Sequence, residues 1–187
     1  MGVSSSQNNR YEKNRNKKSE LKSKNEFNDN KMDEFNNRML EEHNILRKKH
    51  KNTNILKLNI ELCKIAADFL KEIIDEKNQI PFSKIYKNDI LGENVLISEK
   101  KLEPEKVCYE WYKEKKNYNY KLNKFQRGLG HFTQLVWKGT KEVGFSFRNH
   151  ENNFYYVALY YPKGNIMNEF DKNVLEEDIK TKKEDEI

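Results

Sequence analysis

The chain has 187 residues, of which 35% are charged and 35% hydrophobic, and its formal net charge is +6. This length fits one domain of roughly 140 residues with polar tails, which is enough to bury a core. No apolar run approaches the ~18 residues of a membrane span and none follows Met1, so we expect neither a transmembrane helix nor a secretory signal.

Residues 1–32 have the composition of a disordered basic arm. The first six, MGVSSS, satisfy the N-myristoylation pattern, in which Gly2 becomes the N-terminus and a serine stands at position six. Seven basic and two acidic residues between 10 and 24 give a net charge of +5, which would add attraction to an anionic membrane leaflet. The alternative is a low-complexity leader with no anchoring role.

Two amphipathic helices are predicted after this arm. From residue 33 onward, inward-facing residues recur at helical spacing, and this face includes His43 and Arg47. We expect His43 to be a hydrogen-bonded core histidine rather than a ligand. A second helical pattern covers Leu62–Ile73, and residues 75–88 are predicted to form a loop.

Two carboxylates then fall on apolar faces of predicted helices. A helix over Ile90–Ile97 would place Glu93 on an apolar stripe. Pro104 suits a helix start, and Glu114 would share a face of that helix with Val107, Trp111 and Tyr118. A carboxylate that faces a core needs a partner, whereas one at a helix edge stays solvated, and for either glutamate alone the helix-edge position is favoured.

Residues 130–137, with the sequence GHFTQLVW, place one ionisable imidazole in an apolar segment. Phe132, Leu135 and Val136 follow helical spacing, which favours a single helical turn over a strand. The turn is expected to end at Lys138-Gly139-Thr140. His131 therefore marks a candidate site.

Two strands and a polar tail complete the predicted elements. Alternating apolar residues over Val143–Phe147 predict a half-buried strand. The continuously apolar or aromatic run Phe154–Tyr161 is typical of a central strand covered on both faces, and His150 between the two strands is expected to be exposed. Residues 171–187 carry seven acids and four bases, and we expect this tail to remain unfolded.

Two ordered motifs identify a family. GHFTQLVW at 130–137 is followed, 28 residues after His131, by LYYPKGN at 159–165. This pair closely resembles the two signatures of the CAP superfamily, which includes cysteine-rich secretory proteins, wasp-venom antigens and plant pathogenesis-related proteins. Three further matches occur in the right order: LEEHNILR at 40–47, GEN at 92–94 and WYKE at 111–114. The resemblance covers residues 33 to about 175.

The resemblance implies an α+β fold, a three-layer α-β-α sandwich around a central, mainly antiparallel sheet. It divides the chain into the arm 1–32, a CAP domain over 33–170 and the tail 171–187. Secreted members carry several disulfides, but this chain has only Cys63 and Cys108. We therefore expect the protein to lie in a reducing compartment, on the cytosolic side. The subfamily that this chain most resembles is that of the intracellular Golgi-associated pathogenesis-related protein.

The family's cleft holds two histidines and two glutamates, and in some members it takes a divalent cation. Glu93, Glu114 and His131 match three of these positions, but Phe82 stands where the first histidine is expected. No histidine occurs between His50 and His131, so realignment cannot supply one. We therefore expect no required cofactor and at most weak zinc binding by an incomplete set, with Tyr86 or Asp89 as substitute ligands.

Three functions compete. The first is a non-enzymatic protein on a cytosolic membrane face, Golgi included, that binds anionic lipid or sterol and brings partners together; a homodimer is left open. The second is a hydrolase with Ser83 or Ser98 as nucleophile and His131 as base, although no serine motif is present. The third is nucleic-acid binding through the arm, which lacks a recognition motif, so no nucleic-acid partner is expected.

Overall fold

The computed structural model describes residues 31–75 and 90–178. Residues 1–30, with Gly2, and residues 76–89, with Phe82, Ser83, Tyr86 and Asp89, therefore lie outside the described residues. The last two residues of the predicted arm, 31 and 32, and the first residue of the predicted loop, Asp75, are helical. The chain divides into a unit that ends at Phe35 and a unit that begins at Asn36. The fold below is that of the second unit.

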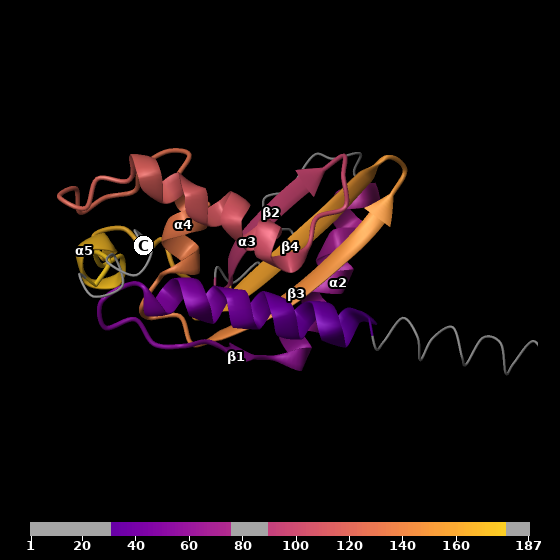
Figure 1. Ribbon diagram of the computed structural model, residues 1–187, viewed down its shortest axis with the longest axis horizontal. Coiled ribbons are helices and arrows are strands. Elements are labelled where there is room, and N and C mark those ends of the chain that lie inside the picture. Colours follow the sequence, from indigo (N-terminus) through magenta and orange to yellow (C-terminus); the bar gives the residue numbers. More distant parts are fainter. Residues whose placement is uncertain (1–30, 76–89, 179–187) are drawn as a thin grey trace, which may run out of the picture. The chain divides into compact units, whose positions relative to one another are not determined.

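A four-stranded sheet forms the middle of this unit (Figure 1). Strands β3 (Glu142–His150) and β4 (Asn153–Tyr161) form an antiparallel hairpin, and β2 (Gly92–Ser98) pairs with the other edge of β4, also antiparallel. The two-residue strand β1 (Lys57–Leu58) runs parallel to β3. The order β1-β3-β4-β2 makes β4 a central strand and confirms a mainly antiparallel sheet.

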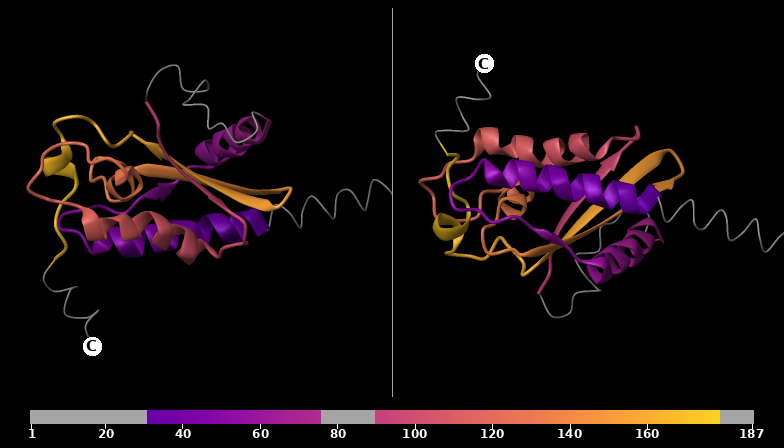
Figure 2. Two further views of the ribbon diagram at one scale, coloured as in Figure 1. Left: turned by 90° about the horizontal axis from the view of Figure 1, so that it is seen from above. Right: turned by 60° about the horizontal axis from the view of Figure 1, so that its bottom comes forward.

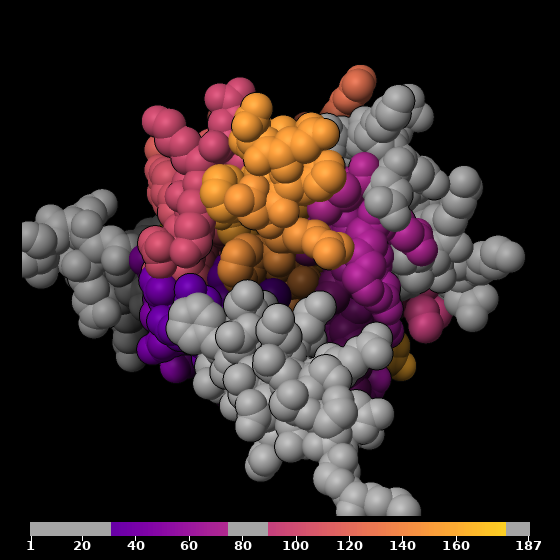
Figure 3. All heavy atoms as spheres, turned by 90° about the vertical axis from the view of Figure 1, so that its right-hand side faces the viewer, coloured from indigo at the N-terminus to yellow at the C-terminus, as the bar shows by residue number. Residues whose placement is uncertain are grey.

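Helices cover both faces of the sheet (Figure 2). Helix α2 (Ile60–Asp75) packs on one face, and residues 36–48, the part of the N-terminal helix within this unit, lie on the other face with α3 (Pro104–Tyr112). Seen from the end of the hairpin, β3 and β4 lie between α2 and the segment that leads into α3 (Figure 3). The predicted three-layer α-β-α sandwich is confirmed.

The strand β4 is buried on both faces, as its continuous apolar sequence predicted. Its odd-numbered residues meet α2 in one core cluster, which comprises Ala66, Phe69, Leu70, Ile73, Tyr155, Val157 and Leu159. Its even-numbered residues face the other layer, where the Tyr160 ring lies 5.9 Å from that of His43. Burial of both sets stabilises each helix layer on the sheet.

Strand β3 is more deeply buried than the half-buried strand that the alternation predicted. Gly144 and Ser146 are buried along with Val143 and Phe145. A side chain at Gly144 would place its Cβ 2.3 Å from the Leu62 carbonyl carbon. The glycine thus lets α2 approach the sheet closely enough to cover this second face.

Two helix predictions were wrong. Most of the predicted helix Ile90–Ile97 lies in the strand β2 (Gly92–Ser98), because pairing with β4 satisfies the backbone of a short apolar run whose spacing does not distinguish a helix from a strand. Helix α3 ends at Tyr112, so Glu114 lies in a 3-10 helix, η1 (Lys113–Asn117).

The tail is also folded beyond residue 170. Helix α5 spans Phe170–Asn173, and Val174 is buried. Glu177 forms an isolated antiparallel β-bridge with His50. Two backbone hydrogen bonds, from Lys51 N to the Glu176 oxygen (3.0 Å) and from the Asp178 nitrogen to Lys49 O (2.8 Å), hold this segment. The polar composition that predicted disorder from residue 171 onward therefore concealed an apolar anchor, Val174, which is buried.

Candidate functional site

The short helix α4 (Gly130–Leu135) carries the predicted imidazole. Phe132, Leu135 and Val136 are fully buried, whereas the side chain of His131 is 44% exposed. The predicted helical turn is therefore confirmed. Its apolar face anchors the helix in the core, and its first turn presents His131 at the surface of a cleft.

Glu114 holds this turn through both carboxylate oxygens. Its Oε1 lies 2.6 Å from His131 Nδ1, and its Oε2 accepts a hydrogen bond of 3.0 Å from the backbone nitrogen of Phe132. The Glu114 side chain is 16% exposed. The carboxylate thus has the partner that its inward position required, and it fixes the orientation of the imidazole ring.

Glu93 faces the same cleft from strand β2, where it is paired with Leu159 of β4. Partial burial raises the pKa of Glu93, and the charge of His131 acts in the opposite direction. The structure therefore places Glu93 and His131 in the wall of one cleft, and Glu114 against His131, although Glu114 is not among the residues that line the cleft. Glu93 interacts with His131 through charge, and Glu114 through a hydrogen bond.

The cleft has a volume of about 460 Å³. Segments from four parts of the chain form its walls: Leu91, Gly92, Glu93, Phe125, Gly128, Gly130, His131, Gln134, Lys163, Gly164 and Asn165. Both sequence motifs contribute to these walls.

Gln134 explains why glycines occur in two of these segments. Its Oε1 accepts a hydrogen bond of 2.7 Å from the Gly164 nitrogen, and its Nε2 donates to Thr140 Oγ1 at 3.2 Å. A Cβ at Gly92 would lie 2.0 Å from Gln134 Oε1, and one at Gly164 would lie 2.9 Å from the same atom. The buried amide therefore joins both motifs at the floor of the cleft, and only glycine leaves room for it.

A buried polar chain supports the site from behind. Asn94 Nδ2 donates to the His131 carbonyl oxygen (3.0 Å) and to the Tyr160 hydroxyl (3.1 Å). The Tyr160 hydroxyl lies 2.9 Å from His43 Nε2, and His43 Nδ1 lies 2.7 Å from the Met39 carbonyl oxygen. Because a carbonyl can only accept, Nδ1 carries the proton, and Nε2 accepts the hydroxyl hydrogen.

This series of hydrogen bonds confirms that His43 is a hydrogen-bonded core residue. The prediction from sequence missed Asn94 and Tyr160, although both lie inside the quoted motifs. The tyrosines of the central strand were the available signal, because a buried hydroxyl requires a partner.

The described part of the site does not fit a zinc ion. Within residues 31–75 and 90–178, no group of three or more histidine, cysteine, aspartate or glutamate side chains is placed to hold a metal. Both oxygens of Glu114 already have partners, and only one imidazole is present, whereas structural zinc takes four ligands. The positions of Phe82, Tyr86 and Asp89 lie outside the described residues, so weak cation binding remains a prediction.

The predicted nucleophile Ser98 lies at the wrong end of its strand. Ser98 pairs with Phe154 of β4. Along β2 it lies four residues from Asn94, whose side chain contacts the His131 carbonyl oxygen. Four extended residues span about 13 Å, so Ser98 cannot exchange a proton with His131. Ser83 lies outside the described residues.

Comparison with known proteins accounts for this architecture. The model of the cysteine-rich secretory protein family, CAP, matches residues 40–161. The chain belongs to the CAP family. It is 34% identical over 145 residues to human Golgi-associated plant pathogenesis-related protein 1, covering 76% of this chain and 93% of that protein. It is 31% identical to protein PRY2 of Saccharomyces cerevisiae over 76% of this chain and 41% of that one.

Solved structures of CAP-like proteins share the fold. The crystal structure of NaASP2 with Zn2+ superposes with a TM-score of 0.62 at 24% identity, covering 76% of this chain and 85% of that one. Schistosoma mansoni venom allergen-like protein 4 superposes with a TM-score of 0.61 at 22% identity, covering 80% and 98%. At these identities the comparison supports the fold alone.

Removal of His131 should test whether the site residues act as a unit. His131→Ala is expected to lower the free energy of unfolding by about 1 to 3 kcal/mol, toward the lower end because the ring is half exposed. It leaves Glu114 Oε1 without its partner and removes the group whose charge lowers the pKa of Glu93. Urea unfolding of His131→Ala, Glu114→Gln and the double variant measures the coupling.

The double variant should be more stable than the sum of the two single losses predicts, because it removes the unpaired charge. His150→Ala is the matched control, since the His150 side chain is 46% exposed, and it should change stability little. Strictly additive losses would show that Glu114 and His131 do not form one constellation.

Proposed function

We propose that this protein is a non-enzymatic CAP-domain protein held at a cytosolic membrane face, where it binds anionic lipid or sterol. The observation that carries this proposal is the N-myristoylation pattern MGVSSS followed by the +5 segment over residues 10–24. One myristoyl chain binds a membrane only marginally, so stable attachment needs a second signal. Basic residues add about 1 kcal/mol each near an anionic leaflet.

The similarity to a Golgi-associated protein over 93% of that protein's length supports the same conclusion. In the described ranges, no helix is both long and apolar enough to cross a bilayer. Membrane attachment would then depend on the acyl chain and the basic residues. The Golgi is the proposed location.

The contacts of the Thr133 hydroxyl and the burial of the two thiols favour binding over catalysis. Thr133 Oγ1 is buried and hydrogen bonded to the Leu129 carbonyl (3.1 Å) and to Asn165 Oδ1 (2.5 Å). Cys63 and Cys108 are both buried, and burial raises the pKa of the Cys108 thiol. The Glu114–His131 pair is satisfied within the protein, so we propose that the cleft needs no metal for its function.

Replacement of Gly2 tests the anchor directly. Gly2→Ala removes the acceptor of the acyl chain, so the protein is expected to move from the membrane to the supernatant fraction of cells. Val3→Ala is the control, because it keeps Gly2 and should keep attachment. Unchanged membrane fractionation of Gly2→Ala would refute the acyl anchor.

Removal of positive charge tests the role of the basic arm in membrane binding. Replacing Lys17, Lys18, Lys22 and Lys24 by glutamine should weaken binding of the myristoylated protein to anionic vesicles, and the same four positions changed to arginine should retain it. Binding to duplex DNA at the same salt concentration distinguishes the nucleic-acid alternative. Tighter salt-dependent binding to DNA than to vesicles would favour that alternative.

A further inference from the structure

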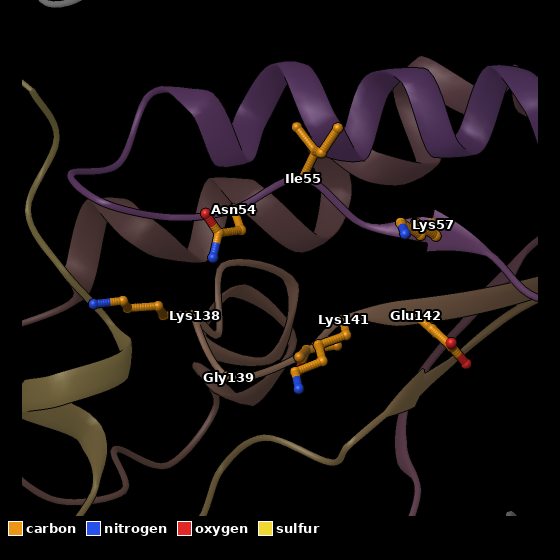
Figure 4. Close-up of a pocket in the computed structure, with 8 residues that line it drawn as sticks. Asn54, Ile55, Lys57, Lys138, Gly139, Lys141 and Glu142 are labelled. Atoms are coloured by element: carbon orange, nitrogen blue, oxygen red, sulfur yellow. The ribbon is translucent and has the colours of Figure 1, made fainter.

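A second hollow lies away from the Glu93–His131 cleft and shares no lining residue with it. Its volume is about 360 Å³, and it lies between β1 and the turn that joins α4 to β3. Three lysines border it, Lys57 from β1 and Lys138 and Lys141 from the turn (Figure 4). The sequence motifs that identified the family gave no indication of it.

The backbone beneath these lysines is fixed. Lys57 N donates to the Lys141 carbonyl oxygen at 3.0 Å, and Lys138 N donates to the Asn173 carbonyl oxygen at 3.0 Å. Arg47 also donates to the carbonyl oxygens of Trp137 (2.9 Å) and Thr140 (3.3 Å) on either side of the turn. The three side chains thus project from a hydrogen-bonded backbone.

The hollow carries an uncompensated positive charge. Among residues 31–75 and 90–178, none of the three lysines forms an ion pair. The single carboxylate in the wall, Glu142, accepts a hydrogen bond of 2.7 Å from Asn59 Nδ2. Three positive charges against one negative charge leave a local excess that an anionic partner would neutralise.

The arrangement of the charges indicates what kind of anion fits. The nitrogen ends of Lys57, Lys138 and Lys141 lie at separate edges of the hollow and do not point toward one another (Figure 4). A single phosphate needs donors that converge on it, whereas the surface of a bilayer offers many phosphates spread over an area. Ile55, which also lines the hollow, is 55% exposed, and an exposed apolar side chain among lysines suits the headgroup region of a membrane.

We propose that Lys57, Lys138 and Lys141, with Ile55, form a membrane-contact surface of the CAP domain that binds the phosphate groups of anionic lipids. This inference rests on the proposed membrane function and adds a contact that is independent of the arm. The domain then has its own affinity for an anionic leaflet. An acyl chain, a basic arm and this surface together would hold the protein more firmly than the first two alone.

The test uses the full chain produced without the acyl group, mixed with phosphatidylcholine vesicles that do or do not contain phosphatidylserine. The triple variant Lys57→Gln, Lys138→Gln, Lys141→Gln should lose about tenfold or more in affinity for the phosphatidylserine vesicles. The control changes three other exposed lysines, Lys100, Lys101 and Lys121, to glutamine, which alters the net charge equally. A triple arginine variant of the hollow should retain binding.

The outcomes separate the surface from the arm. Equal losses in the hollow variant and in its charge-matched control would overturn the proposed surface. Loss only in the Lys17, Lys18, Lys22 and Lys24 glutamine variant would overturn it as well, but would leave the arm-based function standing. If Gly2→Ala stays on membranes while the hollow variant still loses vesicle binding, the acyl anchor fails and the lysine surface stands.

A soluble competitor distinguishes a membrane surface from a single-anion site. Inorganic phosphate at matched ionic strength should displace the protein from phosphatidylserine vesicles no better than chloride does. Displacement by phosphate at concentrations where chloride has no effect would show a compact anion site and overturn the assignment to a bilayer surface. Loss of the Ile55 side chain in Ile55→Ser should reduce vesicle binding further at high salt, where screening weakens the lysine contribution.

Discussion

Arg47→Ala is expected to lower the free energy of unfolding by about 3 to 5 kcal/mol. Arg47 is completely buried, and its guanidinium donates to four backbone carbonyls rather than to a carboxylate. The acceptors are Leu135 O at 2.8 Å, Trp137 O at 2.9 Å, Asn54 O at 2.8 Å and Thr140 O at 3.3 Å. Truncation would leave these oxygens without a donor and open a cavity beside them.

The arginine also has an electrostatic role. Leu135 ends helix α4, so its carbonyl lies at the negative end of the helix dipole, where a cation is favoured. Burial lowers the pKa of Arg47 to about 10, and the charge nonetheless persists at neutral pH. A lysine has one compact ammonium and cannot reach all four carbonyls, so Arg47→Lys should recover only part of the loss.

Urea unfolding at neutral pH measures both variants. Lys48→Ala, at the exposed neighbouring position, is the control and should change stability by less than about 0.5 kcal/mol. A loss below about 1 kcal/mol in Arg47→Ala would show that the carbonyls find other donors. Such a result would also weaken the argument that Arg47 fixes the turn beneath Lys138 and Lys141.

Much of the fold could be predicted from periodicity and motif order. Helical spacing identified the N-terminal helix and α2, and the continuous apolar run identified β4 as a central strand. These signals work because burial on one face leaves a period in the sequence, and burial on both faces leaves a continuous apolar run. The resemblance placed Glu93, Glu114 and His131 in one cleft; Glu93 and His131 line it, and Glu114 contacts His131.

What could not be predicted depends on contacts between distant segments. Glu93 was chosen by helical arithmetic, yet it lies on a strand, and its place in the cleft follows from the pairing of β2 with β4. Arg47 was predicted to face inward, but its four carbonyl partners are up to 93 residues away in sequence. The docking of residues 174–178 on the end of the N-terminal helix likewise has no local signal, because composition describes solvation and not partners.

The second large effect concerns acid, to which His43 should make the protein sensitive. Burial lowers the pKa of His43 to about 3, and the nearby positive charge of Arg47 acts in the same direction, against the hydrogen bond to the Met39 carbonyl. An unfolded histidine titrates near 6.5. Above that pH both states are neutral, and His43 contributes no pH dependence.

As the pH falls below about 6.5, His43 binds a proton in the unfolded state but not in the folded state. Stability then falls by about 1.4 kcal/mol per pH unit, a loss of about 2 kcal/mol between pH 6.5 and 5 and of about 4 to 5 kcal/mol by pH 3. Burial lowers the pKa of His50 as well and adds to the loss.

The carboxylates change the stability at lower pH, or in the opposite direction to His43. The pKa values of Glu105 and Glu110 are lowered by hydrogen bonds from Arg38 and Lys113, so these residues lose stabilisation only below about 4.5. The pKa values of Glu42 and Glu93 are raised by burial, so protonation of these two residues favours the folded state as the pH falls. The window from pH 6.5 to 5 therefore reports mainly on the histidines.

Urea midpoints across this window, for wild type and His43→Gln, isolate the contribution of His43. Glutamine keeps a donor and an acceptor for Met39 and Tyr160 but does not titrate, so its stability should be lower at pH 7 and should change less with pH. The difference between the two slopes should be about 1.4 kcal/mol per pH unit. Equal slopes for wild type and His43→Gln would mean that protonation is accommodated in the core, for instance by rearrangement of the Tyr160 hydroxyl.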